Sequence, residues 1–314
     1  MDRHSVTWRG YWPAAPTPFT RDGALDERAW RELLRLYRSQ GMHGILVNGT
    51  TGEWFAQSDA ERMRLAEIAT EELGGTLTVV IGCTSYTARQ TAELARHARS
   101  VGADGVLSTP PPYAHPNPEE LVQFYRDISD ATDIPIMVYN WPRGVAVEIQ
   151  TETVLRLAEV ANVVAIKNST ANRNLLLETL AAAGDQLIYF GDFVNPAGVD
   201  VLRTMGGDGY IGGGGLLGRE NPEFFEAVWR GDLQRARELG AKSVKLLVQL
   251  MNPDWSGKYG SPQAWLKAAM NLLGQPGGWP RRPLLPVTDE HKLAAIRRAL
   301  ESVGLEVREP VGVA

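Results

Sequence analysis

A lysine that directly follows a buried strand is a candidate for covalent chemistry. In the segment NVVAIKNST (162–170), residues 163–166 are apolar, as in a strand covered on both faces, and Lys167 comes next. Burial disfavours the charged ammonium, so an amine in an apolar pocket has a lowered pKa and is a nucleophile near neutral pH. The alternative is a lysine that only leads from the strand end into water.

A threonine pair lies in a glycine-bounded turn after another apolar run. The sequence NGTTGE places Thr50 and Thr51 between Gly49 and Gly52, directly after HGILV. A turn of this kind between a strand and a helix exposes backbone N–H groups to an anion. The alternative is a tight turn in which the two glycines serve only the backbone angles.

A glycine-rich segment, IGGGGLLG, follows the last apolar run. Gly213, Gly215 and Gly218 match the pattern G-x-G-x-x-G, but no further strand completes a dinucleotide-binding unit. We expect these glycines to let a substrate approach the backbone around Ile211. The alternative is a phosphate site at residues 212–215, after the eighth strand of a barrel.

Eight short apolar runs alternate with segments of helical periodicity. Most runs start roughly 20 to 35 residues apart, which is the length of one strand–helix unit of a parallel sheet. Helix starts are marked by Ser58 with Glu61 and by Asn117 with Pro118. The alternation predicts a (β/α)8 TIM barrel, with an open doubly wound sheet as the alternative. The predicted strands begin near residues 11, 43, 77, 104, 134, 163, 187 and 209.

The alternation stops after the eighth run. From about residue 220 only helical patterns follow, with a break at Gly231 and a restart at Asp232, and the segment 274–286 is too rich in Gly and Pro to be helical. We therefore predict a barrel core over residues 1–220. Residues 221–314 are predicted to form the last barrel helix and a C-terminal helical appendage, packed on the barrel as part of a single structural unit.

The composition disfavours several classes of function. Of 314 residues, 44% are hydrophobic and 22% are charged, as in a soluble globular protein. The formal net charge is −5 and no basic run is present, so nucleic-acid binding is disfavoured. Cys83 is the single cysteine and the five histidines are scattered, so we expect no disulfide and no metal site. The amino-terminal sequence lacks the apolar core of a signal peptide and no apolar stretch is long enough for a membrane span, so we expect a cytoplasmic protein.

Over nearly its whole length, the chain resembles the pyruvate-dependent class I aldolases of the dihydrodipicolinate synthase and N-acetylneuraminate lyase type. The resemblance rests on APTPF, GTTGEW, VYN, AIKNST and MGGDGYIGG, in that order, and on the tail RPLLPVTDEHKLAAIRRALESVGL. It implies a pyruvate-like 2-oxo acid as substrate and no cofactor. It also implies that Lys167 forms an imine with the C2 ketone, so that a C3 carbanion is stabilised as an enamine.

The resemblance implies further roles around this lysine. Tyr139 would carry protons to and from the imine intermediates, which requires a phenol within about 3 Å of the reacting atoms. The alternative for Tyr139 is a core tyrosine with a single hydrogen bond. Thr50 and Thr51, with Gly49 before them, would bind the substrate carboxylate, and the Thr50 hydroxyl would join the proton relay.

Tyr113 matches a tyrosine that reaches across a subunit interface into the neighbouring site. Many members have two tyrosines there, and Pro112 replaces the first of them in this sequence. Because this role needs a second subunit, we expect a homodimer or a homotetramer.

The sequence departs from the family pattern around Arg143. The synthase of lysine biosynthesis grips the carboxylate of its second substrate with an arginine at the position of Gly144, one residue later. Bidentate capture depends on the position of the guanidinium, so this shift argues against the lysine-pathway reaction, although Arg143 stays a candidate substrate-binding residue. Trp54 and Trp141 favour a second-substrate pocket that is more apolar or aromatic than usual. Asn168 stands where an acid commonly follows the lysine.

The motifs together indicate a lyase that forms a Schiff base with pyruvate or a related 2-oxo acid. It would cleave or form a carbon–carbon bond, or eliminate water from a keto-deoxy sugar acid. One alternative is a phosphate-binding barrel enzyme in which Lys167 acts only electrostatically. Another is a non-catalytic relative that keeps the pocket.

Overall fold

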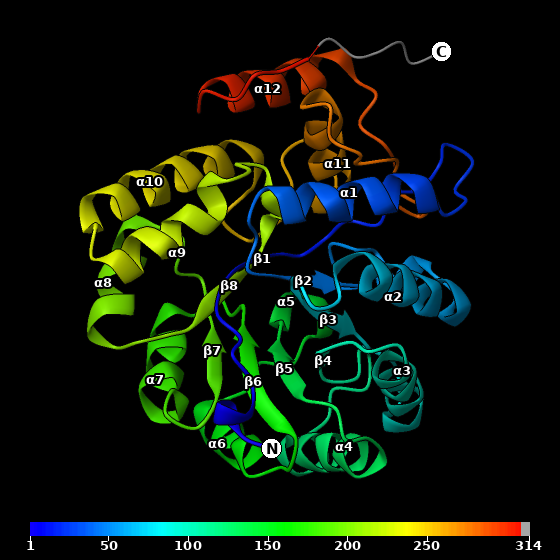
Figure 1. Ribbon diagram of the computed structural model, residues 1–314, viewed down its shortest axis with the longest axis vertical. Coiled ribbons are helices and arrows are strands. Elements are labelled where there is room, and N and C mark those ends of the chain that lie inside the picture. Colours follow the sequence, from blue (N-terminus) through cyan, green and yellow to red (C-terminus); the bar gives the residue numbers. More distant parts are fainter. Residues whose placement is uncertain (309–314) are drawn as a thin grey trace.

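Eight parallel strands form a barrel (Figure 1). In the computed structural model, which describes residues 1–308, the strands pair in the order β1-β8-β7-β6-β5-β4-β3-β2, and a parallel bridge from Ala14 to Leu46 brings β1 next to β2. The predicted (β/α)8 barrel is confirmed, and the open doubly wound sheet is excluded. The strands are β1 (Gly10–Pro13), β2 (Gly44–Val47), β3 (Thr78–Gly82), β4 (Gly105–Ser108), β5 (Ile136–Asn140), β6 (Val163–Asn168), β7 (Ile188–Phe190) and β8 (Gly209–Gly212).

Helices cover the outside of the barrel and continue beyond it. Ser58 with Glu61 starts α2 and Asn117 with Pro118 starts α4, as the sequence indicated. Glu120 also completes a capping box with Asn117. The helices are α1 (Glu27–Ser39), α2 (Asp59–Leu73), α3 (Ala88–Ser100), α4 (Pro118–Ala131), α5 (Pro142–Val145), α6 (Thr151–Ala158), α7 (Arg173–Ala183), α8 (Pro196–Thr204), α9 (Glu220–Arg230), α10 (Leu233–Leu250), α11 (Pro262–Leu272) and α12 (Glu290–Glu301). Within residues 1–308, none of the helices combines the length and the hydrophobicity that a membrane crossing requires.

The register between β5 and β6 positions the two central side chains of the site. Tyr139 is the Cα partner of Lys167, and Met137 is the partner of Ala165 one layer below. Paired residues on neighbouring strands point to the same face of a sheet, and successive residues alternate between faces. Met137 and Ala165 belong to the apolar cluster inside the barrel, whereas Ile166 packs toward the helices. Tyr139 and Lys167 therefore point into the mouth of the barrel.

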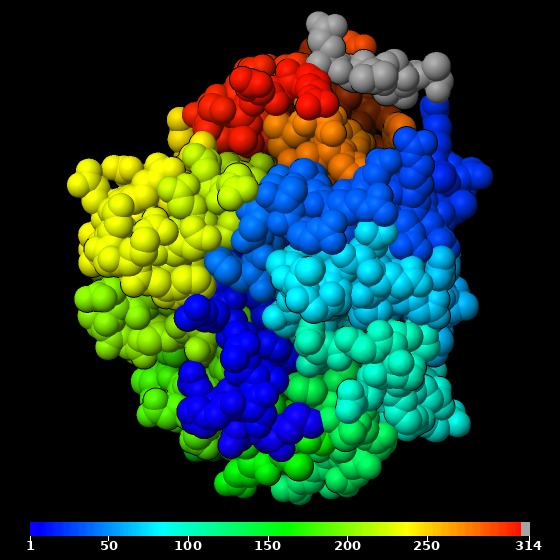
Figure 2. Space-filling view, in the orientation of Figure 1, coloured from blue at the N-terminus to red at the C-terminus, as the bar shows by residue number. Residues whose placement is uncertain are grey.

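Up to residue 308, the C-terminal extension consists of helices and loops without further strands, as predicted. The chain leaves α9 at Gly231, whose φ of 81° suits a glycine, and Asp232 caps α10. In Figures 1 and 2, α11 and α12 lie next to each other at the upper end of the molecule. The division into residues 1–220 and 221–314 stays a prediction, and residues 309–314 lie outside the part that the structure describes.

Candidate active site

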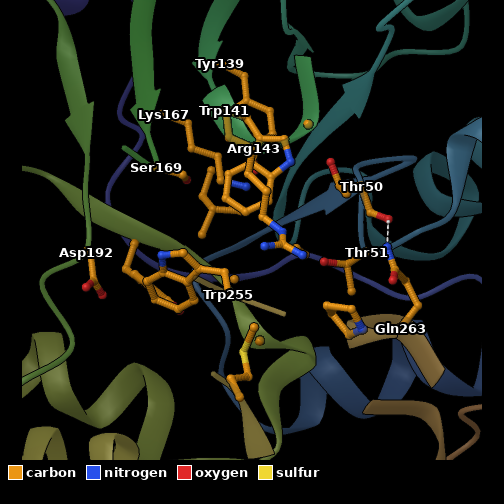
Figure 3. Close-up of a pocket in the computed structure, with 18 of the residues that line it drawn as sticks. Thr50, Thr51, Tyr139, Trp141, Arg143, Lys167, Ser169, Asp192, Trp255 and Gln263 are labelled. Carbon is orange, nitrogen blue, oxygen red and sulfur yellow. Dashed lines mark hydrogen bonds between the residues drawn. The ribbon is translucent and has the colours of Figure 1, made fainter. Parts of the chain in front are cut away.

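A cavity opens at the carboxyl ends of the strands (Figure 3). Its volume is about 370 Å³, within the range of roughly 300–1,000 Å³ that small-molecule sites occupy. Strand ends form one part of the lining and the C-terminal extension forms the other. The lining includes Thr50, Thr51, Phe55, Tyr139, Trp141, Arg143, Lys167, Asn168, Ser169, Asp192, Ile211, Leu247, Met251, Trp255, Gln263, Trp265 and Leu284.

Lys167 presents a buried amine without a charge partner. It is 7% exposed, and its Nζ lies 4.0 Å from the centre of the Tyr139 ring. No carboxylate within residues 1–308 forms an ion pair with it, and burial lowers its pKa to about 7. About half of these amines are therefore neutral, and hence nucleophilic, at neutral pH.

Tyr139 places a phenol beside this amine. Burial raises the pKa of Tyr139, and side-chain hydrogen bonds with Ser169 and Thr50 offset part of the rise. The phenol is therefore protonated at neutral pH and can donate a proton. Ser169, which the sequence reasoning missed, follows Lys167 by two residues and so continues the same face of the strand. The amine and three hydroxyl groups thus lie together at one end of the cavity.

The GTTGE turn is held in place from the C-terminal extension. Glu53, with φ of 59°, is fully buried and forms an ion pair with the equally buried Lys267 of α11. The second carboxylate oxygen of Glu53 accepts a hydrogen bond from the backbone N–H of Arg281 at 2.9 Å. Gln263, at the start of α11, donates a hydrogen bond to the carbonyl of Thr50 at 3.0 Å. The position of the threonines therefore depends on residues more than two hundred positions later.

Two of the predicted site residues do not line the cavity. Gly49 is outside the lining, and a side chain there would meet Cδ2 of Leu46 at 2.9 Å, so this glycine serves the packing of the turn. Tyr113 is 92% exposed, with φ of 74°. Its role in the site of a neighbouring subunit stays a prediction. The structure brings the other candidates together in one cavity: Thr50, Thr51, Tyr139, Arg143, Lys167 and Ile211.

Arg143 lines the cavity and forms an ion pair with Asp254. Its guanidinium lies 3.1 Å from the Asp254 carboxylate and also donates to the Asp254 carbonyl. Hydrogen bonds from Ser256 and from Arg143 lower the pKa of Asp254 to about 2, so the carboxylate is charged at neutral pH. The pair links α5 to the loop that follows α10. Its partner is 111 residues away in the chain, which the sequence pattern did not reveal.

The aromatic lining differs in part from the expectation. Trp141 lines the cavity as predicted, and its ring stacks near that of Tyr139, with 6.0 Å between centroids and 16° between planes. For Trp54 the expectation is wrong, because its ring lies 5.3 Å from the Arg62 guanidinium outside the lining. The next residue, Phe55, lines the cavity instead, because the turn continues as a 3-10 helix over residues 54–56.

Asn168 keeps the surroundings of Lys167 uncharged. Its side-chain oxygen accepts a hydrogen bond from Asn140 at 3.0 Å, and its nitrogen donates to the Tyr189 hydroxyl at 2.7 Å. An acid at this position would favour the charged form of the neighbouring lysine. Asp192, at the end of β7, is a lining residue that the sequence reasoning missed. Burial raises its pKa above the ordinary value, and the charge of Arg173 offsets part of that rise.

The glycines after β8 are explained by backbone turns. Gly213 and Gly214 both have φ of 61°, in the left-handed region that favours glycine. The carbonyl of Gly212 accepts a hydrogen bond from Tyr11 at 3.1 Å, and that of Gly214 from Tyr37 at 2.8 Å. These contacts account for the glycines without a bound phosphate.

Comparison with known proteins identifies the family. Residues 7–302 match the model of the dihydrodipicolinate synthetase family, so the match covers nearly the whole chain. The chain belongs to this family. As a member of the dihydrodipicolinate synthetase family, whose relatives are lyases and synthases of aldolase type, the protein is a lyase.

Individual members of the family cover the chain almost completely. It is 35% identical to the 4-hydroxy-tetrahydrodipicolinate synthase of Bradyrhizobium diazoefficiens, over 95% of this chain and 97% of that protein. It is 33% identical to an uncharacterised DapA-like lyase of Rhizobium meliloti, over 90% and 92%. The crystal structure of the chloride-inhibited dihydrodipicolinate synthase of Acinetobacter baumannii, complexed with pyruvate, superposes with a TM-score of 0.85 at 26% identity, over 95% and 99%.

Proposed function

We propose that the protein is a Schiff-base-forming lyase that acts on pyruvate or a closely related 2-oxo acid. The observation that carries this proposal is the buried amine of Lys167, which has no charge partner within residues 1–308 and a pKa of about 7. Its contact with the Tyr139 ring in a cavity of sufficient size is the second support. A purely electrostatic lysine would gain nothing from a lowered pKa, since it must stay charged.

The residues of the cavity suit the successive steps of an imine mechanism. Neutral Lys167 attacks the C2 ketone, and loss of water gives the imine. Protonated on nitrogen, the imine withdraws electrons, so that C3 loses a proton or a carbon substituent and an enamine forms. Tyr139, with Thr50 and Ser169 beside it, moves these protons. Thr51 and the backbone of the GTTGE turn hold the carboxylate of the substrate.

The reaction is carbon–carbon bond cleavage or formation, or dehydration of a keto-deoxy acid through the same enamine. Arg143 argues against the lysine-pathway reaction. It stands one residue before the expected position, and Asp254 already neutralises its guanidinium. An occupied guanidinium cannot give a second carboxylate the full bidentate interaction.

Borohydride trapping tests the covalent step. The protein is incubated with labelled pyruvate, reduced with sodium borohydride, digested and analysed by mass spectrometry. We expect one adduct, on the peptide that contains Lys167. Lys267 is an internal control, because it is equally buried but paired with Glu53. An adduct on Lys267, or no adduct at all, contradicts the proposal.

The pH dependence of trapping is expected to follow the neutral fraction of Lys167. With a pKa of about 7, this fraction increases about tenfold between pH 6 and pH 8 and then levels off. The measurement is the initial rate of adduct formation between pH 5.5 and pH 10. A rate that keeps rising up to pH 10, as for a solvated lysine, would contradict the burial argument.

An assembly of two or more subunits, in the cytoplasm, is part of the proposal. Tyr113 holds a large exposed ring in a left-handed backbone conformation, which is uncommon for a bulky residue. If it completes a neighbouring site, Tyr113→Phe should lower kcat about 10²-fold while the protein stays an oligomer in sedimentation velocity. Tyr86→Phe, at another exposed tyrosine outside the cavity lining, is the matched control. Equal kcat values for both variants would remove Tyr113 from the site.

A further inference from the structure

The cavity lining combines polar groups at the strand ends with a set of apolar side chains, here named the aromatic end. Lys167, Tyr139 and Thr50 lie at the strand ends, and apolar side chains from the rim and the C-terminal extension line the rest. These are Phe55, Trp141, Leu247, Met251, Trp255 and Leu284. Figure 3 shows the Trp141 and Trp255 rings beside the same cavity as Lys167. Pyruvate has only six non-hydrogen atoms, so the aromatic end is left for a second substrate.

Two features of this aromatic end indicate a binding surface. Phe55 is 43% exposed although it lines a cavity, so a ligand ring would remove apolar surface from water. Trp255 has φ of 64°, a left-handed backbone conformation that is unfavourable for a bulky residue. A bridge between Met251 and Gly257 and the ion pair of the adjacent Asp254 hold this loop. The chain therefore keeps an indole at the cavity against its local preference.

The charges around the cavity disfavour a second anionic group. Within residues 1–308, the cations of the lining are Lys167, which the 2-oxo acid uses, and Arg143, which Asp254 neutralises. Asp192 adds a half-buried carboxyl, and burial raises its pKa, so a negative charge is disfavoured there. Arg173, which offsets part of that effect, does not line the cavity. A ligand with a carboxylate at its far end would find no free cation in the lining.

We infer that the carbonyl partner of the enamine is an uncharged aldehyde that carries an aromatic ring. This inference rests on the proposed imine chemistry of Lys167. Its ring packs between Trp141, Trp255 and Phe55, and its carbonyl carbon faces C3 of the enamine. Aromatic pairs of this kind prefer offset-stacked or edge-to-face geometry, and these three side chains offer aromatic partners in the cavity lining.

The reaction balances without any additional reagent. C3 of the enamine forms a bond to the aldehyde carbon, and the aldehyde oxygen takes a proton and becomes a hydroxyl. Water then hydrolyses the imine and releases Lys167 and a 4-aryl-4-hydroxy-2-oxobutanoate. The reverse reaction cleaves the same bond and returns pyruvate and the aromatic aldehyde.

The first test compares aldehydes at a saturating concentration of pyruvate. We expect kcat/KM for benzaldehyde to exceed that for glyceraldehyde and that for succinic semialdehyde by at least about tenfold. A preference for glyceraldehyde or for succinic semialdehyde overturns the inference, while an adduct on Lys167 in the trapping experiment would still support the proposed function. A failure of trapping itself is a failure of the proposed function.

Two variants make the test specific to the aromatic end. Trp255→Ala should lower kcat/KM for benzaldehyde about tenfold, whereas Trp229→Ala, on α9 and outside the lining, should leave it unchanged. The rate of pyruvate trapping in each variant separates a loss of aldehyde binding from a loss of imine formation. Asp254→Asn frees Arg143 and should raise kcat/KM for succinic semialdehyde about tenfold. Equal effects of the two tryptophan variants, or no gain for succinic semialdehyde, contradict the inference.

Discussion

The Lys167→Met variant is expected to lose lyase activity by about 10⁴-fold or more, because the covalent intermediate cannot form. The same variant should be more stable than the wild type at pH 7. The folded-state pKa of about 7 lies below the unfolded value of about 10.4, so the unfolded chain binds more protons between these two values. The stability of the wild type therefore rises with pH across this window. Methionine has a side chain of similar length and removes the free-energy cost of burying a charged amine.

Two measurements check this prediction, namely kcat/KM and thermal unfolding at pH 7. Lys292→Met, at an exposed lysine of α12, is the control, and it should change neither kcat/KM nor the melting temperature. A drop in melting temperature together with the loss of activity would indicate a structural role for Lys167. Residual activity above about one per cent would contradict covalent catalysis by this amine.

The Lys267→Met variant is expected to destabilise the protein by about 3–5 kcal/mol, because it leaves the Glu53 carboxylate buried without its charge partner. For a chain of 314 residues, that change lowers the melting temperature by about 5–8 °C. The displaced GTTGE turn also carries Thr50 and Thr51, so KM for pyruvate should rise. Thermal unfolding and steady-state kinetics measure the two effects.

The matched control for Lys267 is a surface ion pair. Lys242 and Glu220 are each about a quarter exposed, and Lys242→Met should cost no more than about 1 kcal/mol. In the double variant Glu53→Leu with Lys267→Met, no buried charge is left unpaired, so most of the lost stability should return. Equal melting temperatures for the Lys242 and Lys267 variants would show that the buried pair does not hold the turn.

Local patterns in the sequence were sufficient to predict the barrel and several of the strand-end residues that line its cavity. Strand and helix periodicity placed the elements, and strand-end positions made Lys167 and Tyr139 candidates, because parallel strands converge at one end. Their proposed roles came from the family resemblance. Their mutual register follows from the pairing of β5 with β6. Ser169 could have been found by the same alternation of faces, and Asp192 by its place at the end of β7.

The aromatic end could not be predicted in the same way. Trp255 lies near the site only because a loop of the C-terminal extension returns over the barrel mouth, and no short-range pattern specifies that return. The expectation for Trp54 was wrong because residues 54–56 form a 3-10 helix. In that conformation Phe55, and not Trp54, lines the cavity. The pairing of Arg143 with Asp254 likewise depends on tertiary packing alone.

The hydrogen bond from Gln263 to Thr50 and the ion pair between Lys267 and Glu53 have a consequence for engineering. A chimeric enzyme that joins the barrel of one family member to the terminal helices of another separates these partners. Such exchanges should succeed only where the GTTGE turn and α11 are transferred together. The two segments have to be exchanged as one unit, although they lie far apart in the sequence.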